Sequence, residues 1–373
     1  MLVDEHRPIT VTNADNRILA KCMVASVVDI LSDFLLPQQK GFVPGRNGAD
    51  HIRELNEAFY RAVENNESGF ALFLDTHKAF DSIFHDFIIT ILDHIGLDRW
   101  FVNVVRALLF AVRVTPVLGE PTNVWIHILR GVKQGCPLSP LLFIICMDPL
   151  LFFLSSIDDI CPFAFADDLA LYTDHILSFL SALPLYTEFS LASGLKANFE
   201  KTYILPTREG SLDHFLAVFP GDWKKIKQKS VVTYLGVPFG HNLDSYKVFE
   251  GAVNKFRNRV SECRSVIRRT RFDIRIHTMN IFFLPIIHYL TQFFVLPQLH
   301  LKAICEIVRT TIIGFNSFGY LHLIAPQGCL RARPQLIDPG NFNLAALAAQ
   351  TELNQWDRID SAPLVEDHRR RPM

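Results

Sequence analysis

The most constraining feature of this sequence is a pair of adjacent aspartates, Asp167 and Asp168, in the middle of the apolar run 163–172. Two short apolar arms around a polar centre predict a β-hairpin with the carboxylates at its tip. A third carboxylate, Asp75, closes the apolar run 70–74, which we expect to be a strand. The three carboxylates could then meet at one edge of a sheet.

Converging carboxylates favour a site for divalent metal ions, because like charges at close range repel unless cations lie between them. Two magnesium ions about 3.5–4 Å apart can activate a hydroxyl group and neutralise a leaving pyrophosphate, which is the chemistry of nucleotidyl transfer. Aspartate pairs are also common, and this chain has a second one, Asp158-Asp159, in a polar turn after two serines. Asp167-Asp168 instead lies among apolar residues, where an unpaired charge is costly. Spacing and expected burial alone leave a metal site and an ordinary pair both open.

The rest of the chain predicts a mixture of helices and strands in two or three subdomains, because 373 residues with 49% apolar side chains exceed one small core. A helix is expected within residues 7–46, before a Gly-Pro-Gly loop at 41–45. Further helices are expected near residues 86–96, 100–111, 138–154 and 176–192, strands near 113–118, 124–129, 202–205 and 231–237, and helical structure after 240.

Mean hydropathy of +0.20 requires membrane helices to be considered. The two most apolar stretches, 141–154 and 281–296, are interrupted by Asp148-Pro149 and by Pro285, His288 and Gln292, so neither gives eighteen clean apolar residues. We therefore expect buried helices and no membrane partner. Seven cysteines without a C-x-x-C pair predict reduced, buried thiols of an intracellular protein.

Charge is nearly balanced over the whole chain, with 37 basic and 38 acidic residues, which by itself does not favour a nucleic-acid binder. Residues 221–275, however, hold 13 Lys or Arg against five acids. Such a stretch is typical of a solvated helix face, and it is also what a surface that follows a phosphate backbone requires. Both interpretations stay open at this point.

Seven ordered motifs in this chain resemble the reverse transcriptases of non-LTR (LINE-type) retrotransposons. Residues 341–356 are similar to the segment that follows the polymerase in those elements. The motifs are Arg7-Pro-Ile, Gln39-Lys-Gly-Phe-Val-Pro-Gly-Arg46, Phe73-Leu-Asp75-Thr-His-Lys-Ala-Phe80-Asp81, Arg130-Gly-Val-Lys-Gln134-Gly-Cys-Pro-Leu-Ser-Pro140, Phe165-Ala-Asp167-Asp168, Ser193-Gly-Leu-Lys-Ala-Asn-Phe-Glu-Lys201 and Tyr234-Leu-Gly236.

The resemblance implies an α+β right-hand polymerase of fingers, palm and thumb. Compared with that family, the chain is expected to be N-terminally truncated, without the upstream fingers strand and without an endonuclease domain. The implied parts are incomplete fingers at 1–64 completed by about 98–140, a palm at 65–97 and 141–240, a helical thumb at 241–330, and a C-terminal segment at 331–373.

The same resemblance implies a role for individual residues around the carboxylates. Asp75, Asp167 and Asp168 match the family's metal-binding residues. Phe80 matches the steric gate, whose ring would clash with a ribose 2′-hydroxyl and so favour deoxynucleotides. An ordinary core phenylalanine is the alternative, since the chain has 31 of them.

Further site residues are implied in the fingers, the palm and the thumb. Gln134 would contact the incoming nucleotide, and glycine at position 135 permits close backbone approach. Cations would neutralise the triphosphate or protonate the leaving pyrophosphate. A primer-positioning hairpin and the basic start of the thumb would hold a template–primer duplex by its backbone. These positions are Gln134 and Gly135, Arg7 and Arg17 for the triphosphate, Lys201 for the pyrophosphate, Tyr234, Leu235 and Gly236 for the primer, and Lys255 and Arg259 for the duplex.

The activity implied is that of an RNA-directed DNA polymerase using an RNA template, a DNA primer, deoxynucleoside triphosphates and two Mg²⁺ ions, with Mn²⁺ as a substitute. The family would place it in the cytoplasm and the nucleus. His77 stands where that family usually has an acidic or polar residue, and Phe165 replaces the usual tyrosine. The alternative is a catalytically inactive retrotransposon remnant that only binds RNA or template–primer duplex.

Overall fold

A central five-stranded sheet organises the first of two units, which divide the chain at Met1–His241 and Asn242–Met373. The structure is a computed structural model that describes residues 9–312 except 111, 119, 122, 123, 209 and 211. The C-terminal segment expected at 331–373 and the end of the expected thumb therefore lie outside the described residues.

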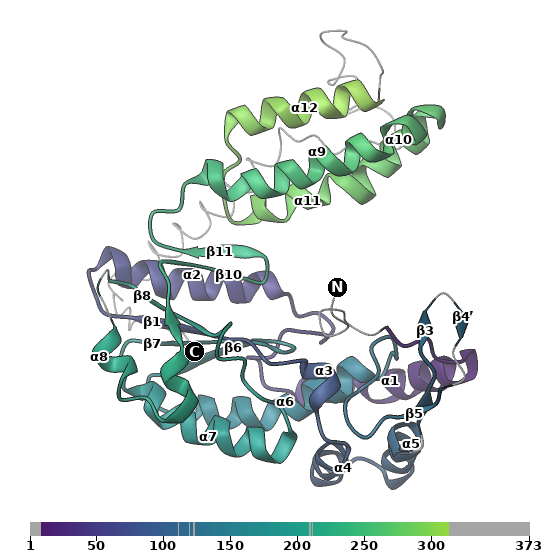
Figure 1. Cartoon of the computed structure of the whole chain (residues 1–373), viewed down its shortest axis with the longest axis vertical. Coiled ribbons are helices and arrows are strands. Elements are labelled where there is room, and N and C mark those ends of the chain that lie inside the picture. The colour runs from purple at the N-terminus through teal and green to yellow at the C-terminus, as the bar shows by residue number, and fades with distance from the viewer. Residues whose placement is uncertain are drawn as a thin grey trace, which may run out of the picture. The chain divides into compact units, whose positions relative to one another are not determined.

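The sheet has the strand order β6-β7-β1-β8-β9 (Figure 1). Its central strand β1 (Phe70–Leu74) pairs antiparallel with β7 (Asp168–Thr173) and β8 (Tyr203–Pro206). The remaining strands are β6 (Cys161–Phe165), antiparallel to β7, and β9 (Lys227–Gln228), parallel to β8. Residues 71–74 of β1 are buried, because this strand has neighbours on both sides and helices on both faces, which explains its continuous apolar run.

Helices cover both faces of this sheet (Figure 1). On one face lie α6 (Ser139–Ser155) and α7 (Ser178–Ser193), and on the other lies α2 (Gly48–Glu64). Residues 141–147 of α6 are all buried, so this helix is apolar all round because it is a core helix. Its one acid, Asp148, accepts a hydrogen bond from the Leu36 amide at 2.9 Å. The described residues contain no helix that is both long and apolar enough to cross a membrane.

Further helices of the first unit lie around the sheet. The expected helices near 86–96 and 100–111 are present, and the first ends at His94, two residues before Gly96, whose φ of +77° only glycine adopts readily. The elements are α1 (Ala14–Phe34), α3 (Ala79–Ser82), α4 (His85–His94), α5 (Arg99–Phe110), α8 (Asp213–Leu216) and the 3₁₀ turn η2 (Gly221–Lys225).

Three expected strands differ in the structure. The segments 113–118 and 124–129 form only short pairs, β2 (Arg113–Val114) with β5 (Ile126–His127) and β3 (Val117–Leu118) with β4 (Glu120–Pro121). The single strand expected at 231–237 from its residue pattern is a hairpin, as the family resemblance implied for residues 234–236. Leu235 and Gly236 adopt φ values of +47° and +79° and reverse the chain. Its strands are β10 (Val231–Tyr234) and β11 (Val237–Gly240).

The second unit is helical throughout its described part, as expected. The longest helix of that part, α9 (Ser245–Arg269), buries apolar residues at helical spacing and packs against α11 (Pro285–His288) and α12 (Gln298–Ile312). The N-cap Asp244 accepts the Tyr246 amide at 2.9 Å. The other elements are α10 (Phe272–Thr278), the π-helical turn η3 (Met279–Phe283), α11 (Pro285–His288), the 3₁₀ turn η4 (Leu290–Gln292) and α12 (Gln298–Ile312).

The structure confirms the mixed α and β class, and it corrects the prediction of buried cysteines. Cys146 is buried on α6, but Cys22, Cys161 and Cys263 are exposed. A cysteine in an apolar stretch can still point outward when the stretch is an amphipathic helix or an edge strand. All six described cysteines are free thiols, and Cys329 lies outside the described residues.

Candidate active site

One cavity of about 670 Å³ in the first unit brings together residues from separate segments of the chain. It lies beyond the end of the central strand β1. Its walls come from residues 75–81, 133–136, Ser139, Pro140, Asp167, Asp168, Asn198 and Lys201. Seven of the fourteen site residues predicted from the sequence therefore line the same space, namely Asp75, Phe80, Gln134, Gly135, Asp167, Asp168 and Lys201.

The three predicted carboxylates meet there because β1 and β7 are neighbouring antiparallel strands. Leu74 at the end of β1 pairs with Leu169 near the start of β7. Asp75 follows β1, and Asp168 begins β7 in register with Phe165, so both lie at the same sheet edge. Antiparallel pairing puts the end of one strand beside the beginning of the next.

The burial expected for the acidic pair is only partly present. Asp167 is half-buried and Asp168 is exposed, so the argument from a costly buried charge was wrong. The apolar arms are buried in the sheet, but the turn between them projects into the cavity. Tight hairpins leave their tip residues outside the core even when both strands are apolar.

Asp75 is held by a residue to which the sequence assigned no role. The side-chain amide of Asn198 donates to Asp75 Oδ2 at 2.9 Å, and its backbone amide donates to the Asp75 carbonyl at 2.7 Å. Nearby, burial raises the pKa of Tyr186 to about 12, although a side-chain hydrogen bond with Thr76 acts in the opposite direction. The motif at 193–201 contained the signal for Asn198, since it is the only asparagine there.

The donor chemistry of the three carboxylates fits magnesium, which prefers oxygen ligands and few protein carboxylates. Asp75, Asp167 and Asp168 supply such oxygens on one cavity wall. Within the described part of the chain, no three His, Cys, Asp or Glu side chains are already grouped closely enough to hold a metal ion. The residue types therefore fit a divalent ion, but the three side chains do not converge on one point in this structure.

Phe80 lies on α3 at the floor of the cavity. Its ring stacks on Phe143 of α6, with centroids 4.5 Å apart and planes 13° apart. The Phe42 ring meets it edge-on at 6.3 Å. These contacts fix the ring while leaving one part of it at the cavity surface.

Gln134 and Gly135 form another wall. The Gln134 side-chain amide donates to both carboxylate oxygens of Asp81, at 3.0 and 3.1 Å. Gly135 has a φ of +116°, and a Cβ there would lie 2.6 Å from the Thr10 carbonyl oxygen, so only glycine fits this approach. Asp81 is a second residue to which the sequence assigned no role, although it stands in the motif around Phe80.

Two lysines border the cavity. Lys201 is exposed, and its backbone amide donates to the Asn198 carbonyl at 3.0 Å. Lys133 is half-buried, and this burial lowers the pKa of its ammonium group. Lys133 also lines a neighbouring cavity of about 680 Å³ beside α1 and α5. Only Lys201 was singled out from the sequence.

The remaining predicted residues lie elsewhere. Arg7 is outside the described residues, and Arg17 is exposed on α1 and does not line the cavity. Tyr234 is buried in the hairpin β10–β11, where its ring packs on Phe73, and its hydroxyl donates to the Phe163 carbonyl at 3.3 Å. Leu235 and Gly236 form the turn of that hairpin, with Leu235 half-buried and Gly236 exposed.

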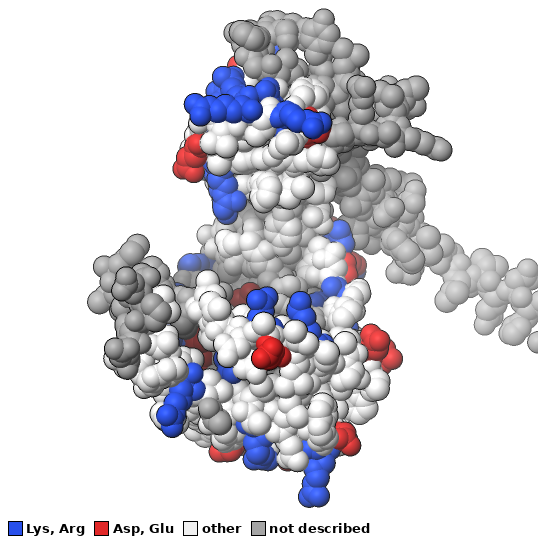
Figure 2. All heavy atoms as spheres, turned by 90° about the vertical axis from the view of Figure 1, so that its right-hand side faces the viewer, with Lys and Arg blue, Asp and Glu red and all other residues white. Residues whose placement is uncertain are grey.

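The basic stretch belongs partly to each unit. In the second unit, Lys255 and Arg259 are exposed one turn apart on α9. Figure 2 shows Lys and Arg side chains gathered on the face of this unit that is in view, with fewer Asp and Glu. This distribution fits a solvated helix face and a phosphate-binding surface alike.

A family model described as reverse transcriptase (RNA-dependent DNA polymerase) matches residues 3–239 of the chain. The match therefore contains every part of the first unit that lines the cavity.

Several curated proteins are distantly similar to the chain. A 149 kDa protein of transposon TX1 from Xenopus laevis is 26% identical over 247 residues, which cover 63% of this chain and 19% of that protein. A Pol polyprotein from the retrotransposable element R2 of Popillia japonica is 33% identical, covering 52% of this chain and 29% of its own length. A probable RNA-directed DNA polymerase from transposon BS of Drosophila melanogaster is 26% identical, covering 38% and 16%. The chain spans less than a third of the length of these relatives.

Solved structures that resemble the chain include telomerases from two Candida species. A telomerase from Candida albicans, in complex with a fragment of telomeric RNA, has a TM-score of 0.47 and 12% identity, covering 83% of this chain and 49% of its own. An apo telomerase from Candida tropicalis has a TM-score of 0.43 and 11% identity, covering 81% and 50%.

Proposed function

The chain belongs to the reverse transcriptase family, and from this premise we propose that it is an RNA-directed DNA polymerase that extends a primer 3′-hydroxyl with deoxynucleotides. One observation carries the proposal. The predicted carboxylates, the predicted gate Phe80, Gln134 and Lys201 come from separate segments and line a single cavity. Nucleotidyl transfer needs anionic metal ligands, a nucleotide-sized space and a cation for the leaving group side by side.

In the mechanism, Asp75, Asp167 and Asp168 would hold two Mg²⁺ ions, with Mn²⁺ as a substitute. Bound there, the ions would activate the primer 3′-hydroxyl and neutralise the charge that develops on the phosphates. Asn198 would orient Asp75, since its amide donates to Oδ2 at 2.9 Å. A carboxylate fixed by a neighbouring donor needs no reorientation when a ligand arrives.

Phe80 and Gln134 would select and orient the nucleotide. The Phe80 ring is stacked on Phe143 with a separation of 4.5 Å, so it cannot move aside easily to admit a 2′-hydroxyl. Gln134 is held by Asp81, and its amide is aligned along the same wall. A fixed aromatic floor and a fixed amide wall reduce the conformational freedom of a bound sugar and base.

Lys201 and Lys133 would act on the phosphate side. Lys201 is exposed at the rim and would stabilise the leaving pyrophosphate electrostatically. Burial lowers the pKa of Lys133, which makes its ammonium a better proton donor than a fully solvated lysine. One lysine would thus supply charge and the other a transferable proton.

The template and primer would be held outside the cavity. By family resemblance, the hairpin turn at Leu235 and Gly236 would contact the primer, and Lys255 and Arg259 of α9 would contact duplex phosphates. The division into fingers, palm and thumb stays a prediction. It would make the second unit the start of the thumb.

The test is primer extension on an RNA template with purified chain, labelled deoxynucleotides and Mg²⁺. The wild type should extend the primer, and the double variant Asp167→Asn, Asp168→Asn should not. Asp75→Asn alone should also abolish extension. Asn keeps the shape of Asp and removes its charge, so binding of template–primer should be retained in each variant.

Two outcomes would contradict the proposal. Full activity in either carboxylate variant would remove those residues from the reaction. Tight template–primer binding by the wild type with no incorporation, even with Mn²⁺, would favour a remnant that binds nucleic acid without copying it.

A further inference from the structure

The loop between α1 and α2 runs beside the tip of the hairpin that carries the acidic pair. The Lys40 amide donates to the Ala164 carbonyl at 2.9 Å, and the Ala164 amide donates to the Gln38 carbonyl at 2.9 Å. Gln39 and Ala164 form a parallel bridge between these two bonds. The loop is therefore attached to β6 just before the turn that leads to Asp167.

Gln39 is fully buried and reaches that turn with its side chain. Its Oε1 accepts the amide of Ala166 at 2.9 Å and the amide of Gly41 at 2.8 Å. Its Nε2 lies 3.5 Å from the Ala166 carbonyl oxygen. One side-chain amide thus faces both backbone polar groups of the residue that precedes Asp167.

Ala166 needs such support because its backbone is left-handed, with a φ of +56°. Residues with a Cβ adopt this conformation only where surrounding contacts hold it. The direction of the chain at Asp167 and Asp168 depends on this one residue. If Ala166 relaxed to a right-handed or extended conformation, both carboxylates would leave their present positions on the cavity wall.

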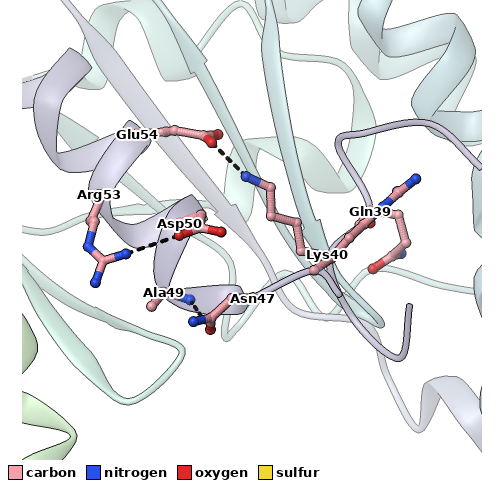
Figure 3. Close-up of polar contacts among 8 residues, drawn as sticks. Gln39, Lys40, Asn47, Ala49, Asp50, Arg53 and Glu54 are labelled. Atoms are coloured by element: carbon pink, nitrogen blue, oxygen red, sulfur yellow. Dashed lines mark hydrogen bonds and ion pairs between the residues drawn. The ribbon is translucent and has the colours of Figure 1, made fainter. Parts of the chain in front are cut away.

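The loop itself is fixed on several sides. The Arg46 guanidinium donates to the carbonyls of Ser32, Leu35, Leu36 and Gln39, at 2.5 to 2.8 Å. In Figure 3, Lys40 reaches Glu54 on α2, and Asn47 caps the same helix through the Ala49 amide. Gln39 and Lys40 are neighbours, but their side chains extend in different directions. The Lys40–Glu54 ion pair therefore holds the loop on α2, while the Gln39 amide bonds to the turn at Ala166.

Gly41 shows how closely loop and turn approach. A Cβ at this position would lie 2.4 Å from the Ala166 nitrogen, closer than any real contact. The loop can supply the Gln39 bonds only because position 41 carries no side chain.

We propose that Gln39 is a positioning residue for Asp167 and Asp168, which it keeps on the cavity wall by clamping Ala166 in its left-handed conformation. This inference rests on the proposed polymerase function, in which the two carboxylates act directly. The alternative is that Gln39 only satisfies buried backbone groups and stabilises the fold. The two roles predict different losses in a Gln39 variant. If Gln39 positions the turn, kcat and the protection of the turn should fall; if it only stabilises the fold, folding and every function should be impaired together.

The decisive variant is Gln39→Met, which has a similar length and fills the same space without the hydrogen bonds. The matched control is Gln38→Met, because the neighbouring Gln38 has a buried Oε1 with no hydrogen-bond partner among the described residues. We would measure kcat, the KM for deoxynucleotide, the Kd for template–primer, and amide exchange at Ala166 and Asp167.

For Gln39→Met, kcat should fall about 10- to 100-fold, as for other small displacements of reacting groups. The KM and the template–primer Kd should stay within about twofold of the wild type, because the contacts of substrate with other walls remain. Exchange at Ala166 and Asp167 should become about tenfold faster without a change in β1, as expected for local opening. Gln38→Met should match the wild type in all four.

A second variant at the same turn is Gly41→Ala, which keeps the Gln39 amide group. Its Cβ would lie 2.4 Å from the Ala166 nitrogen and 3.0 Å from Gln39 Oε1, so it disturbs both partners of their hydrogen bond. It should lower kcat and accelerate exchange at the same two amides.

Three results would overturn the inference: unchanged kcat in Gln39→Met, unchanged exchange at Ala166, or a parallel loss of template–primer binding and of exchange protection throughout β1. If the wild type itself extends no primer, the proposed polymerase function fails. Amide exchange at Ala166 then still tests whether Gln39 holds Ala166 in its left-handed conformation, and unchanged exchange in Gln39→Met rejects that role.

Discussion

Single amide side chains set the arrangement of charge around the cavity. Asn198 donates to Asp75, Gln134 donates to Asp81, and Gln39 holds the turn before Asp167. Each amide comes from a different segment from the acid that it serves. Amides suit this role because they orient a carboxylate or a backbone group without adding a charge that would compete with a metal ion.

Phe80 is the residue whose role is simplest to test. Phe80→Val removes the ring beneath the expected position of the sugar and should reduce discrimination against ribonucleotides by about 10- to 100-fold, which is typical when one apolar contact decides selection. The measurement is the ratio of kcat/KM for deoxynucleotide and ribonucleotide. The control is Phe189→Val, since Phe189 is also half-buried and packs edge-on against Phe87, away from the cavity. Unchanged sugar selection in Phe80→Val would exclude the gate role.

His51 on α2 should make the first unit sensitive to acid. Burial and the nearby charge of Lys40 lower the pKa of this imidazole to about 3, so it is neutral in the fold. An unfolded chain takes up a proton near pH 6.5, and the folded chain does so only near pH 3, so stability falls as pH decreases through this window. As the pH falls from 8 to 5, the free energy of unfolding should decrease by about 2 kcal/mol because of this one group.

His51→Leu tests this contribution. Over the same pH change, the free energy of unfolding of the variant should decrease by about 2 kcal/mol less than that of the wild type, because leucine does not bind a proton. Urea unfolding at both pH values measures the difference. Equal losses in the two proteins would show that His51 does not carry the acid sensitivity.

At the scale of elements, close backbone approaches determine how loops reach the sheet edge. Gly131 has a φ of +84°, and a Cβ there would lie 2.7 Å from the backbone of Asp81 in α3. Its amide donates to the Ile83 carbonyl at 2.6 Å, and the Val132 amide donates to the Phe80 carbonyl at 2.6 Å. These contacts attach the segment that carries Gln134 to the helix that carries Phe80.

Gly131→Ala should therefore cost more stability than Gly45→Ala. Gly45 has a similar φ of +78°, but a Cβ there would meet nothing within 4 Å. In the control Gly45→Ala, the free energy of unfolding should fall only by the cost of placing an alanine in the left-handed conformation, about 1–2 kcal/mol. Gly131→Ala should lose at least about 1 kcal/mol more, from displaced backbone, and should lower primer extension as well. Equal losses in urea unfolding would mean that the close approach is relieved without cost.

For the whole molecule, the nearly neutral net charge of −1 hides a basic second unit. Lys255 and Arg259 are exposed on α9. If this face holds duplex phosphates, the double variant Lys255→Ala, Arg259→Ala should weaken template–primer binding and lower the slope of log Kd against log salt by about 0.9 per lost contact.

The control for this test exchanges the two cations without removing charge, as Lys255→Arg, Arg259→Lys. It should keep the salt slope of the wild type, because the slope depends on how many phosphates are neutralised. A slope that is unchanged in the alanine variant would assign these residues to an ordinary solvated face.

The sequence by itself was sufficient for the local elements and for the family resemblance. Apolar periodicity predicted α4, α5, α6 and the hairpin β6–β7, because these segments bury a regular face or a whole strand. Motif order pointed to Asp75, Asp167 and Asp168, since their residue types carry the chemistry directly. Prediction from the sequence failed for the short strands β2 to β5, because such strands depend on their partners. It also failed for Asp168, whose apolar neighbours in the sequence were taken to mean that the side chain is buried.

Only the tertiary structure decided which residues support the candidate site. Asn198 is 123 residues from Asp75, and Gln39 is 127 residues from Ala166, so no periodicity or local pattern connects them. Their contacts arise because β1 lies between β7 and β8 and because the α1–α2 loop runs along β6. A sequence specifies local conformation through neighbouring side chains, whereas the partner of a buried amide depends on which distant segments the sheet order brings together.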